Sequence, residues 1–137
     1  MVPAAFTVVF IAGNAQDITR FWMAVLTAGY ACYGTLPWTA ARPPRMLSAP
    51  EATLLMRINV HVLGRVSHNM NTFPSGHVAV ALAAALVVCS VSLLWGVGFL
   101  AMTAGIAVAA VTGRYHYFVD VLVGAGIGLG ATVTAFF

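Results

Sequence analysis

The chain has 137 residues, 61% of them hydrophobic and only 7% charged, with a formal net charge of +3. A soluble domain carries roughly 25% charged residues. The composition therefore excludes an ordinary soluble globular protein and predicts one membrane-embedded domain over residues 1–137.

The first part of the chain contains one helix of membrane-spanning length. Residues 1–13 are apolar but supply only about half of the roughly 20 residues that cross a bilayer. After a polar break at 13–16, a helix is predicted to begin at Asp17 or Thr19 and to run to about Leu36, where a proline follows.

Residues 37–74 form the longest segment that contains polar residues. Four prolines prevent one continuous helix in its first part and leave a stiff loop that presents Arg42 and Arg45. From Glu51 to about His68 the pattern becomes amphipathic, with arginines and histidines on one helical face. This pattern predicts a helix that lies in the membrane interface, with its histidines on the wet face.

The rest of the chain is almost entirely apolar. No charged residue occurs between His77 and Arg114, and one helix of this length would be about 54 Å long at 1.5 Å per residue, far more than a bilayer requires. Gly96 and Gly98 mark the predicted fold point of a helical hairpin. The predicted helices are 75–95, 98–112 and 115–137.

The sequence therefore predicts an all-α polytopic bundle with three membrane spans, an N-terminal partial span and an interfacial helix. In this topology His77 and His116 emerge on the same side of the membrane. The helix that ends before Pro37 delivers Arg42 and Arg45 to that side too. Such convergence is hard to obtain from scattered polar residues of a core.

The last helix carries two overlapping GxxxG patterns, Gly124 with Gly128 and Gly126 with Gly130. Small residues at this spacing allow close approach between membrane helices. Packing inside the bundle is the simpler interpretation, and a homodimer through the Gly124/Gly128 face is the alternative.

His116 and Asp120 have the spacing of two residues on one helix face. A carboxylate that accepts a proton from one imidazole nitrogen fixes the tautomer and leaves the other nitrogen to act as a nucleophile. An aspartate within a membrane span is costly and indicates a functional site. The alternatives are a structural cap or an ion pair between Asp120 and Arg114.

Ser75, Gly76 and His77 open an apolar helix after Pro74. The first turn of a helix collects unpaired amides and the positive end of the helix dipole, which favours a bound anion. Glycine allows a ligand to approach the backbone closely, and the serine hydroxyl adds a donor.

These two segments resemble motifs of the type 2 phosphatidic acid phosphatase superfamily, a group of membrane lipid phosphatases and phosphotransferases. Pro74–His77 is similar to the second motif, and His116–Asp120, leading into Val121–Gly124, is similar to the third. The resemblance covers roughly residues 37–130, and makes 37–74 the active-site loop.

The resemblance implies a role for each matching residue. His116 would attack phosphorus and become a phosphohistidine, with Asp120 orienting it. His77 would protonate the leaving alkoxide and later activate water. Ser75 and Gly76, together with arginines, would bind the phosphate oxygens, so that the family needs neither a metal nor a cofactor.

The chain departs from the family pattern at two basic positions. The first motif ends in Arg-Pro, matched by Arg42-Pro43, but its lysine position is Thr35 here. The arginine of the third motif falls at Ala110, whereas Arg114 lies two residues before the histidine. The assigned phosphate-binding arginines are therefore Arg45 and Arg42, followed by Arg114.

Three functions remain open at this stage. Hydrolysis of a lipid phosphate, phosphatidic acid or a polyprenyl (di)phosphate, comes first. The run Pro43-Pro44-Arg45 is more similar to the inositol phosphorylceramide synthase branch and indicates head-group transfer between lipids. A non-enzymatic bis-histidine haem or metal protein using His77 and His116 is the third, and an inactive relative is a further alternative.

The expected partners are the bilayer and a lipid phosphate, with no nucleic acid. Most relatives that act on membrane lipids face away from the cytoplasm, and we expect the same orientation in the cell membrane. The positive-inside tendency of the Arg42–Arg65 segment points the other way.

Overall fold

A computed structural model describes residues 1–35, 37–39, 44 and 73–137. The described residues form helices and no strand, which confirms the all-α prediction for this part of the chain. The helices are α1 (Val2–Ala12), α2 (Ala15–Gly34), α4 (Gly76–Val91), α5 (Leu93–Thr112) and α6 (Phe118–Phe136). The predicted interfacial helix, Arg42 and Arg45 lie outside the described residues.

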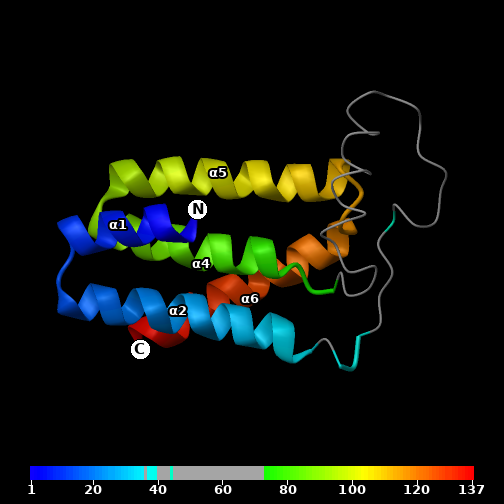
Figure 1. The fold of residues 1–137 in the computed structure, drawn as a ribbon, viewed down its shortest axis with the longest axis horizontal. Coiled ribbons are helices and arrows are strands. Elements are labelled where there is room, and N and C mark those ends of the chain that lie inside the picture. The colour runs from blue at the N-terminus through cyan, green and yellow to red at the C-terminus, as the bar shows by residue number, and fades with distance from the viewer. Residues whose placement is uncertain (36, 40–43, 45–72) are drawn as a thin grey trace.

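The helices lie alongside one another and run along the length of the molecule (Figure 1). α2 ends, α4 begins, α5 ends and α6 begins at one end of the bundle, which we call the histidine end. The turns between α1 and α2 and between α4 and α5 lie at the far end. The topology thus brings the segments that contain His77 and His116 to the same end, as predicted.

α2 begins earlier than predicted, because Asn14 caps it. The Asn14 side chain accepts hydrogen bonds from the amides of Gln16 (2.8 Å) and Asp17 (3.2 Å), and the Asp17 carboxylate accepts one from the Asn14 amide (3.0 Å). This reciprocal arrangement is a capping box. The residues taken as a polar break are therefore a helix start, and neither Asp17 nor Thr19 is the first residue.

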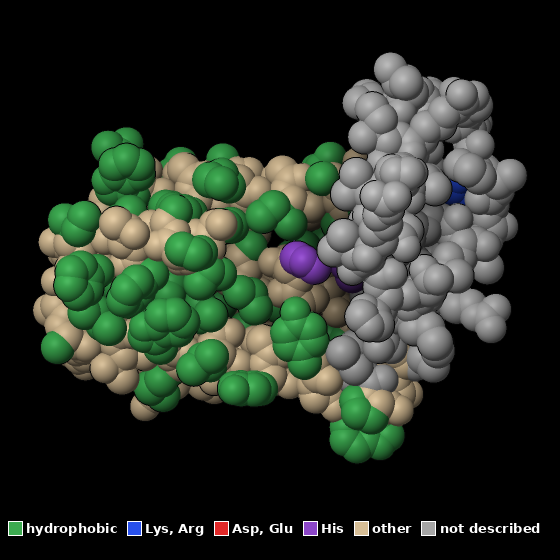
Figure 2. Space-filling model, in the orientation of Figure 1, with side chains coloured by type: hydrophobic (Ala, Val, Ile, Leu, Met, Phe, Trp, Pro, Cys, Tyr) green, Lys and Arg blue, Asp and Glu red, His purple; other side chains and the backbone are tan. Residues whose placement is uncertain are grey.

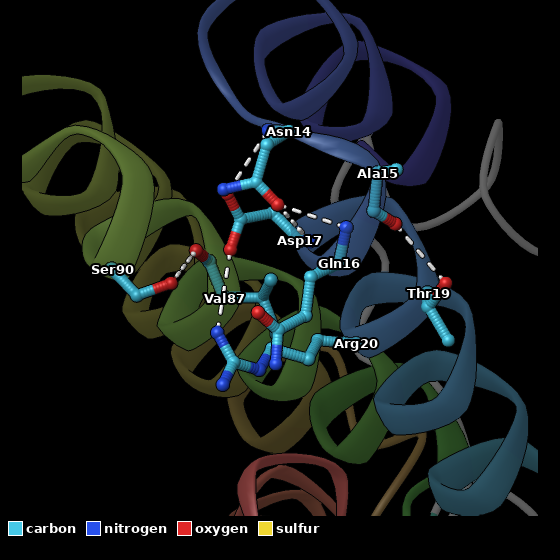
Figure 3. A network of polar contacts seen from close by, with 8 residues as sticks. All are labelled: Asn14, Ala15, Gln16, Asp17, Thr19, Arg20, Val87 and Ser90. Atoms are coloured by element: carbon cyan, nitrogen blue, oxygen red, sulfur yellow. Dashed lines mark hydrogen bonds and ion pairs between the residues drawn. The ribbon is translucent and has the colours of Figure 1, made fainter.

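A polar cluster that includes Asn14, Asp17 and Arg20 lies at the start of α2, at the far end of the bundle (Figure 3). The Arg20 guanidinium lies 3.5 Å from the Asp17 carboxylate. It also lies over the Phe136 ring, 4.6 Å from the ring centre. Such a cation–π contact contributes about 0.5–1 kcal/mol at an exposed site. Arg20 therefore links the start of one helix to the end of another.

The turn between α4 and α5 lies at Ser92, not at Gly96 and Gly98 as predicted. Ser92 has an extended backbone (φ −152°, ψ 110°) that ends one helix and starts the next. Gly96 lies within α5, where an added Cβ would be 2.5 Å from the Cα of Cys89. Position 96 requires glycine because α5 approaches α4 closely there, and not because the chain turns.

α6 begins at Phe118, later than the predicted start at 115. Residues 113–117 form a turn in which Arg114 has a left-handed backbone (φ 58°). Tyr117 is the N-cap residue, and its amide donates to the Asp120 carboxylate (2.9 Å). His116 therefore precedes the helix instead of lying on its first turn.

Among the described helices, α4 is central and contacts each of the other four. Two glycines of α6 allow it to approach α4 closely. A Cβ added at Gly124 would lie 2.4 Å from the Ser75 carbonyl oxygen, and one added at Gly128 would lie 2.5 Å from the Ala79 carbonyl oxygen. The Gly124/Gly128 face thus packs inside the bundle, against α4. A homodimer through this face stays a prediction.

Two described helices, α5 and α6, are long and apolar enough to cross a membrane. The three spans predicted from the sequence are not shown. α4 has 16 residues and α1 has 11, which makes them shorter apolar helices, and α2 is not among the two candidates despite its 20 residues. The start of α2 includes both Asp17 and Arg20.

Candidate active site

The first histidine of the site comes from the start of α4. Ser75 is the N-cap residue, Gly76 is the first helical residue and His77 follows, with an exposed side chain. The Ser75 carbonyl oxygen accepts the first hydrogen bond of the helix, from Ala79 (3.0 Å). Histidine side chains are visible at this end of the molecule in Figure 2, beside the residues drawn in grey.

The second histidine comes from the turn between α5 and α6. The amides of Tyr115 and His116 both donate to the Ala110 carbonyl oxygen (3.0 Å each), which holds the turn against the last part of α5. The His116 ring lies 6.5 Å from the His77 ring, centre to centre, at an interplanar angle of 60°. Two histidines separated in sequence by the whole α4–α5 hairpin are thus neighbours.

Asp120 lies beneath this pair and is only 4% exposed. One carboxylate oxygen, Oδ2, is 3.5 Å from His116 Nδ1 and also accepts the Tyr117 amide (2.9 Å). Its backbone carbonyl oxygen accepts the Ser75 amide (3.0 Å). Asp120 therefore contacts both motifs, and turns Nδ1 of His116 toward a negative charge.

The start of α4 has the features of an anion site. The Ser75 hydroxyl is fully buried and does not cap its own helix, and among the described residues it has no hydrogen-bond partner. Leaving a buried polar group unpaired costs about 1–3 kcal/mol. An oxygen of a bound anion would supply the missing partner, beside first-turn amides and the positive end of the helix dipole.

Gly76 is not required by the packing of the described residues. No described glycine has a positive φ. An added Cβ at Gly76 would be no closer than 3.6 Å to any described neighbour, an ordinary contact with the Cβ of Cys32. Glycine at this position leaves the backbone of the first turn accessible to a ligand.

Five of the residues predicted for the site lie together at the histidine end: Ser75, Gly76, His77, His116 and Asp120. Arg114 belongs to the same turn as His116, and its amide donates to the Val111 carbonyl oxygen (3.0 Å). The other two predicted residues, Arg42 and Arg45, lie outside the described residues. Within the described ranges, no group of three or more histidine, cysteine or acidic residues could hold a metal ion.

Sequence reasoning missed two residues near the site. Tyr33, in the last turn of α2, lies against Gly76. Thr39 follows α2, and its hydroxyl lies within hydrogen-bond distance of the carbonyl oxygens of Thr35 (2.9 Å) and Phe73 (3.0 Å). Thr39 thereby joins the end of the α2 segment to the entry of the Pro74–His77 motif. Neither residue has a motif signature that could have revealed it.

Comparison with known proteins supports the resemblance seen in the motifs. The family model of the PAP2 superfamily matches residues 21–136, a range that includes both histidines and Asp120. No curated protein and no solved structure matches the chain. Because the match covers well over half of the sequence, the chain belongs to the PAP2 superfamily, whose members are generally phosphatases or phosphotransferases.

Proposed function

We propose that the protein is an integral membrane enzyme that hydrolyses a lipid phosphate ester through a phosphohistidine intermediate. The observation that carries this proposal is the meeting of three features at one end of the bundle. These are the neighbouring rings of His77 and His116, the carboxylate of Asp120 behind His116, and the unpaired Ser75 hydroxyl at the start of α4. Family membership supports phosphoester chemistry in general.

The proposed reaction has two steps. In the first, Nε2 of His116 attacks phosphorus, the bond from phosphorus to the lipid oxygen breaks, and His77 gives its proton to that oxygen, so that the lipid alcohol leaves. In the second, His77 takes a proton from water as the water attacks phosphorus, which breaks the phosphorus–nitrogen bond and releases phosphate. Asp120 holds Nδ1 of His116 and stabilises the positive charge on the ring in both steps.

In this scheme, hydrogen-bond donors and arginines of the protein stabilise the negative charge of the phosphate. The Ser75 hydroxyl and the first amides of α4 bind the phosphate oxygens, and their hydrogen bonds strengthen as charge develops in the transition state. Arg114, Arg42 and Arg45 are the proposed cationic partners, because a guanidinium can hold two phosphate oxygens at once. No metal or cofactor has a step in this scheme.

Head-group transfer is the second candidate function, and the run Pro43-Pro44-Arg45 favours it. In that reaction the hydroxyl of an acceptor lipid takes the place of water in the second step. The phosphohistidine and the roles of His116 and His77 are unchanged. The two functions therefore differ in the acceptor alone, and the same variants test the shared chemistry.

The substrate class fits a site at the end of an apolar bundle. The family and the two apolar helices α5 and α6 support a membrane location. We place the histidine end outside the cytoplasm, at the cell membrane, where phosphatidic acid or a polyprenyl (di)phosphate would present its head group. Among the described residues, Arg114 lies in the same turn as His116 while the carboxylate of Asp120 is buried, and this arrangement supports an anionic head group.

Phosphate release from phosphatidic acid and from a polyprenyl diphosphate, measured in EDTA with detergent-purified protein, tests the proposal. We expect release by the wild type, none by His116→Ala, and a loss of about 10²–10⁴-fold in His77→Ala, the usual contribution of a general acid or base. Ser90→Ala, near the end of α4 that lies away from both motifs, is the control and should keep its activity.

Two outcomes would contradict the hydrolytic mechanism. Full activity of His116→Ala would exclude the phosphohistidine, and a strict need for added magnesium or zinc would exclude the metal-independent scheme. Release only after addition of a lipid alcohol, with the phosphoryl group recovered on that alcohol, would assign the transferase function instead. A Soret band in the purified protein would support the haem alternative.

A further inference from the structure

The last turn of α2 lies directly against the first turn of α4. A Cβ built on Gly76 would lie 3.6 Å from the Cβ of Cys32, 3.8 Å from Cζ of Tyr33 and 3.9 Å from the Tyr33 hydroxyl oxygen. The hydroxyl end of this tyrosine therefore stands beside the first helical residue of α4. These are ordinary contact distances, so Cys32 and Tyr33 are the described neighbours that the Cα of Gly76 faces across the α2–α4 contact.

Tyr33 faces outward at this point instead of filling the core. Its side chain is 61% exposed, whereas the neighbouring Cys32 is 1% exposed and belongs to the core. The phenol thus reaches past the α2–α4 contact, with its ring against the start of α4 and its surface open. A ligand bound at the first amides of α4 would meet the hydroxyl without any rearrangement of the backbone.

Thr35, another polar residue at this end of α2, uses its hydroxyl within its own helix. Thr35 is the C-cap residue of α2, and its hydroxyl donates to the Cys32 carbonyl oxygen of its own helix (2.8 Å). That bond occupies the hydroxyl proton, so Thr35 does not offer a donor to a ligand in this arrangement. The nearest described donor that α2 presents to Gly76 is the tyrosine two residues earlier.

We propose that the Tyr33 hydroxyl donates a hydrogen bond to the phosphate of the substrate at the start of α4. This rests on the proposed function, and adds a ligand-binding residue to the site. An O–H donor and a charged oxygen lie 2.5–2.7 Å apart in a hydrogen bond. The Tyr33 hydroxyl lies beside Gly76, so a phosphate oxygen at the first turn of α4 would be within its reach. The phenol donates a hydrogen bond without adding a charge, so α2 contributes a neutral donor to the site.

A tyrosine at the membrane interface is the rival interpretation, because tyrosines gather there in many membrane proteins. Tyr30 provides the matched control. It lies one turn earlier on the same helix and is 73% exposed, and no part of the proposed site involves it. If Tyr33 is merely an interfacial residue, removing either hydroxyl has the same small effect.

The experiment compares Tyr33→Phe, Tyr30→Phe and the wild type. Orthovanadate, a phosphate analogue, is the probe, and two quantities are measured: its inhibition constant against phosphate release, and the rise in melting temperature that it causes without turnover. We expect Tyr33→Phe to bind vanadate about tenfold more weakly, the size expected for one hydrogen bond to a charged group. Tyr30→Phe should match the wild type in both.

The outcomes separate this proposal from the one on which it rests. Tight vanadate binding by the wild type with no change in Tyr33→Phe would overturn the role of Tyr33 and leave the phosphatase proposal standing. Equal weakening in both tyrosine variants would assign both to the interface and also overturn it. A wild type that neither releases phosphate nor binds vanadate would overturn the phosphatase site itself.

Discussion

Asp120, in the first turn of α6, contacts both the N-terminal end of α4 and the proposed nucleophile His116. Its Oδ2 atom serves both the Tyr117 amide and Nδ1 of His116, and its carbonyl oxygen holds the Ser75 amide. The same residue is therefore a helix cap and a proposed catalytic partner. The sequence left a structural cap and a catalytic role as alternatives, and the geometry allows both at once.

Two substitutions at Asp120 separate these roles. Asparagine keeps an acceptor for the Tyr117 amide but loses the negative charge beside His116, so we expect Asp120→Asn to unfold near the wild-type temperature and to be a slow enzyme. Alanine removes the cap as well and should cost about 1 kcal/mol more in unfolding free energy. Thermal unfolding and phosphate release check both. Equal stability of the two variants would contradict the capping role.

The residues of the two motifs could be predicted because their chemistry is unusual in an apolar chain. A histidine or an aspartate in such a sequence stands out, and the order of the motifs places them on one side. Tyr33 gave no such signal, because an exposed tyrosine at the end of a membrane helix already has an ordinary explanation at the interface. Only the contact with Gly76 distinguishes it.

Within the described residues, the order of the helices agrees with the prediction, whereas several of their ends differ. Gly96 and Gly98 look like a turn in sequence, yet glycine serves equally where two helices approach closely. Sequence does not say which neighbour Gly96 will meet, and the neighbour is the backbone of Cys89. The start of α2 differs from the prediction because Asn14, in the polar stretch 13–16, is a good capping residue and begins the helix there.

The matched pair Gly96→Ala and Gly98→Ala tests the corrected hairpin. A methyl group at Gly96 would collide with Cys89, whereas at Gly98 nothing lies within 4 Å. We expect Gly96→Ala to lose about 1–3 kcal/mol of unfolding free energy through overpacking. Gly98→Ala should be neutral or gain up to about 1 kcal/mol from helix propensity. Denaturant unfolding in detergent measures both, and the opposite order would place the turn at the glycines.

At the scale of the whole molecule, the described charged groups divide between the two ends. Asp17 and Arg20 lie at the far end, and Arg114 and Asp120 at the histidine end, with α5 and α6 apolar between them. A helix of 20 residues is about 30 Å long, close to the apolar thickness of a bilayer. The two ends should therefore contact water on opposite sides of the membrane.

Single cysteines at the two ends of α5 test this arrangement. In a background without Cys32 and Cys89, Ser92→Cys marks the far end and Thr112→Cys marks the histidine end. We expect a membrane-impermeant maleimide added to intact cells to label Thr112→Cys and to leave Ser92→Cys unlabelled. The reverse pattern would turn the active site toward the cytoplasm. Labelling of both from outside would contradict a membrane-crossing α5.

The hydrogen bond between Thr39 and Phe73 closes the chain at the base of the segment that connects them. The entry to the Pro74–His77 motif is therefore held from two sides, by the Thr39 hydroxyl after α2 and by the Asp120 carbonyl oxygen in α6. A substitution remote from both imidazole rings, such as Thr39→Val, is expected to change the position of His77 relative to His116 without removing either ring.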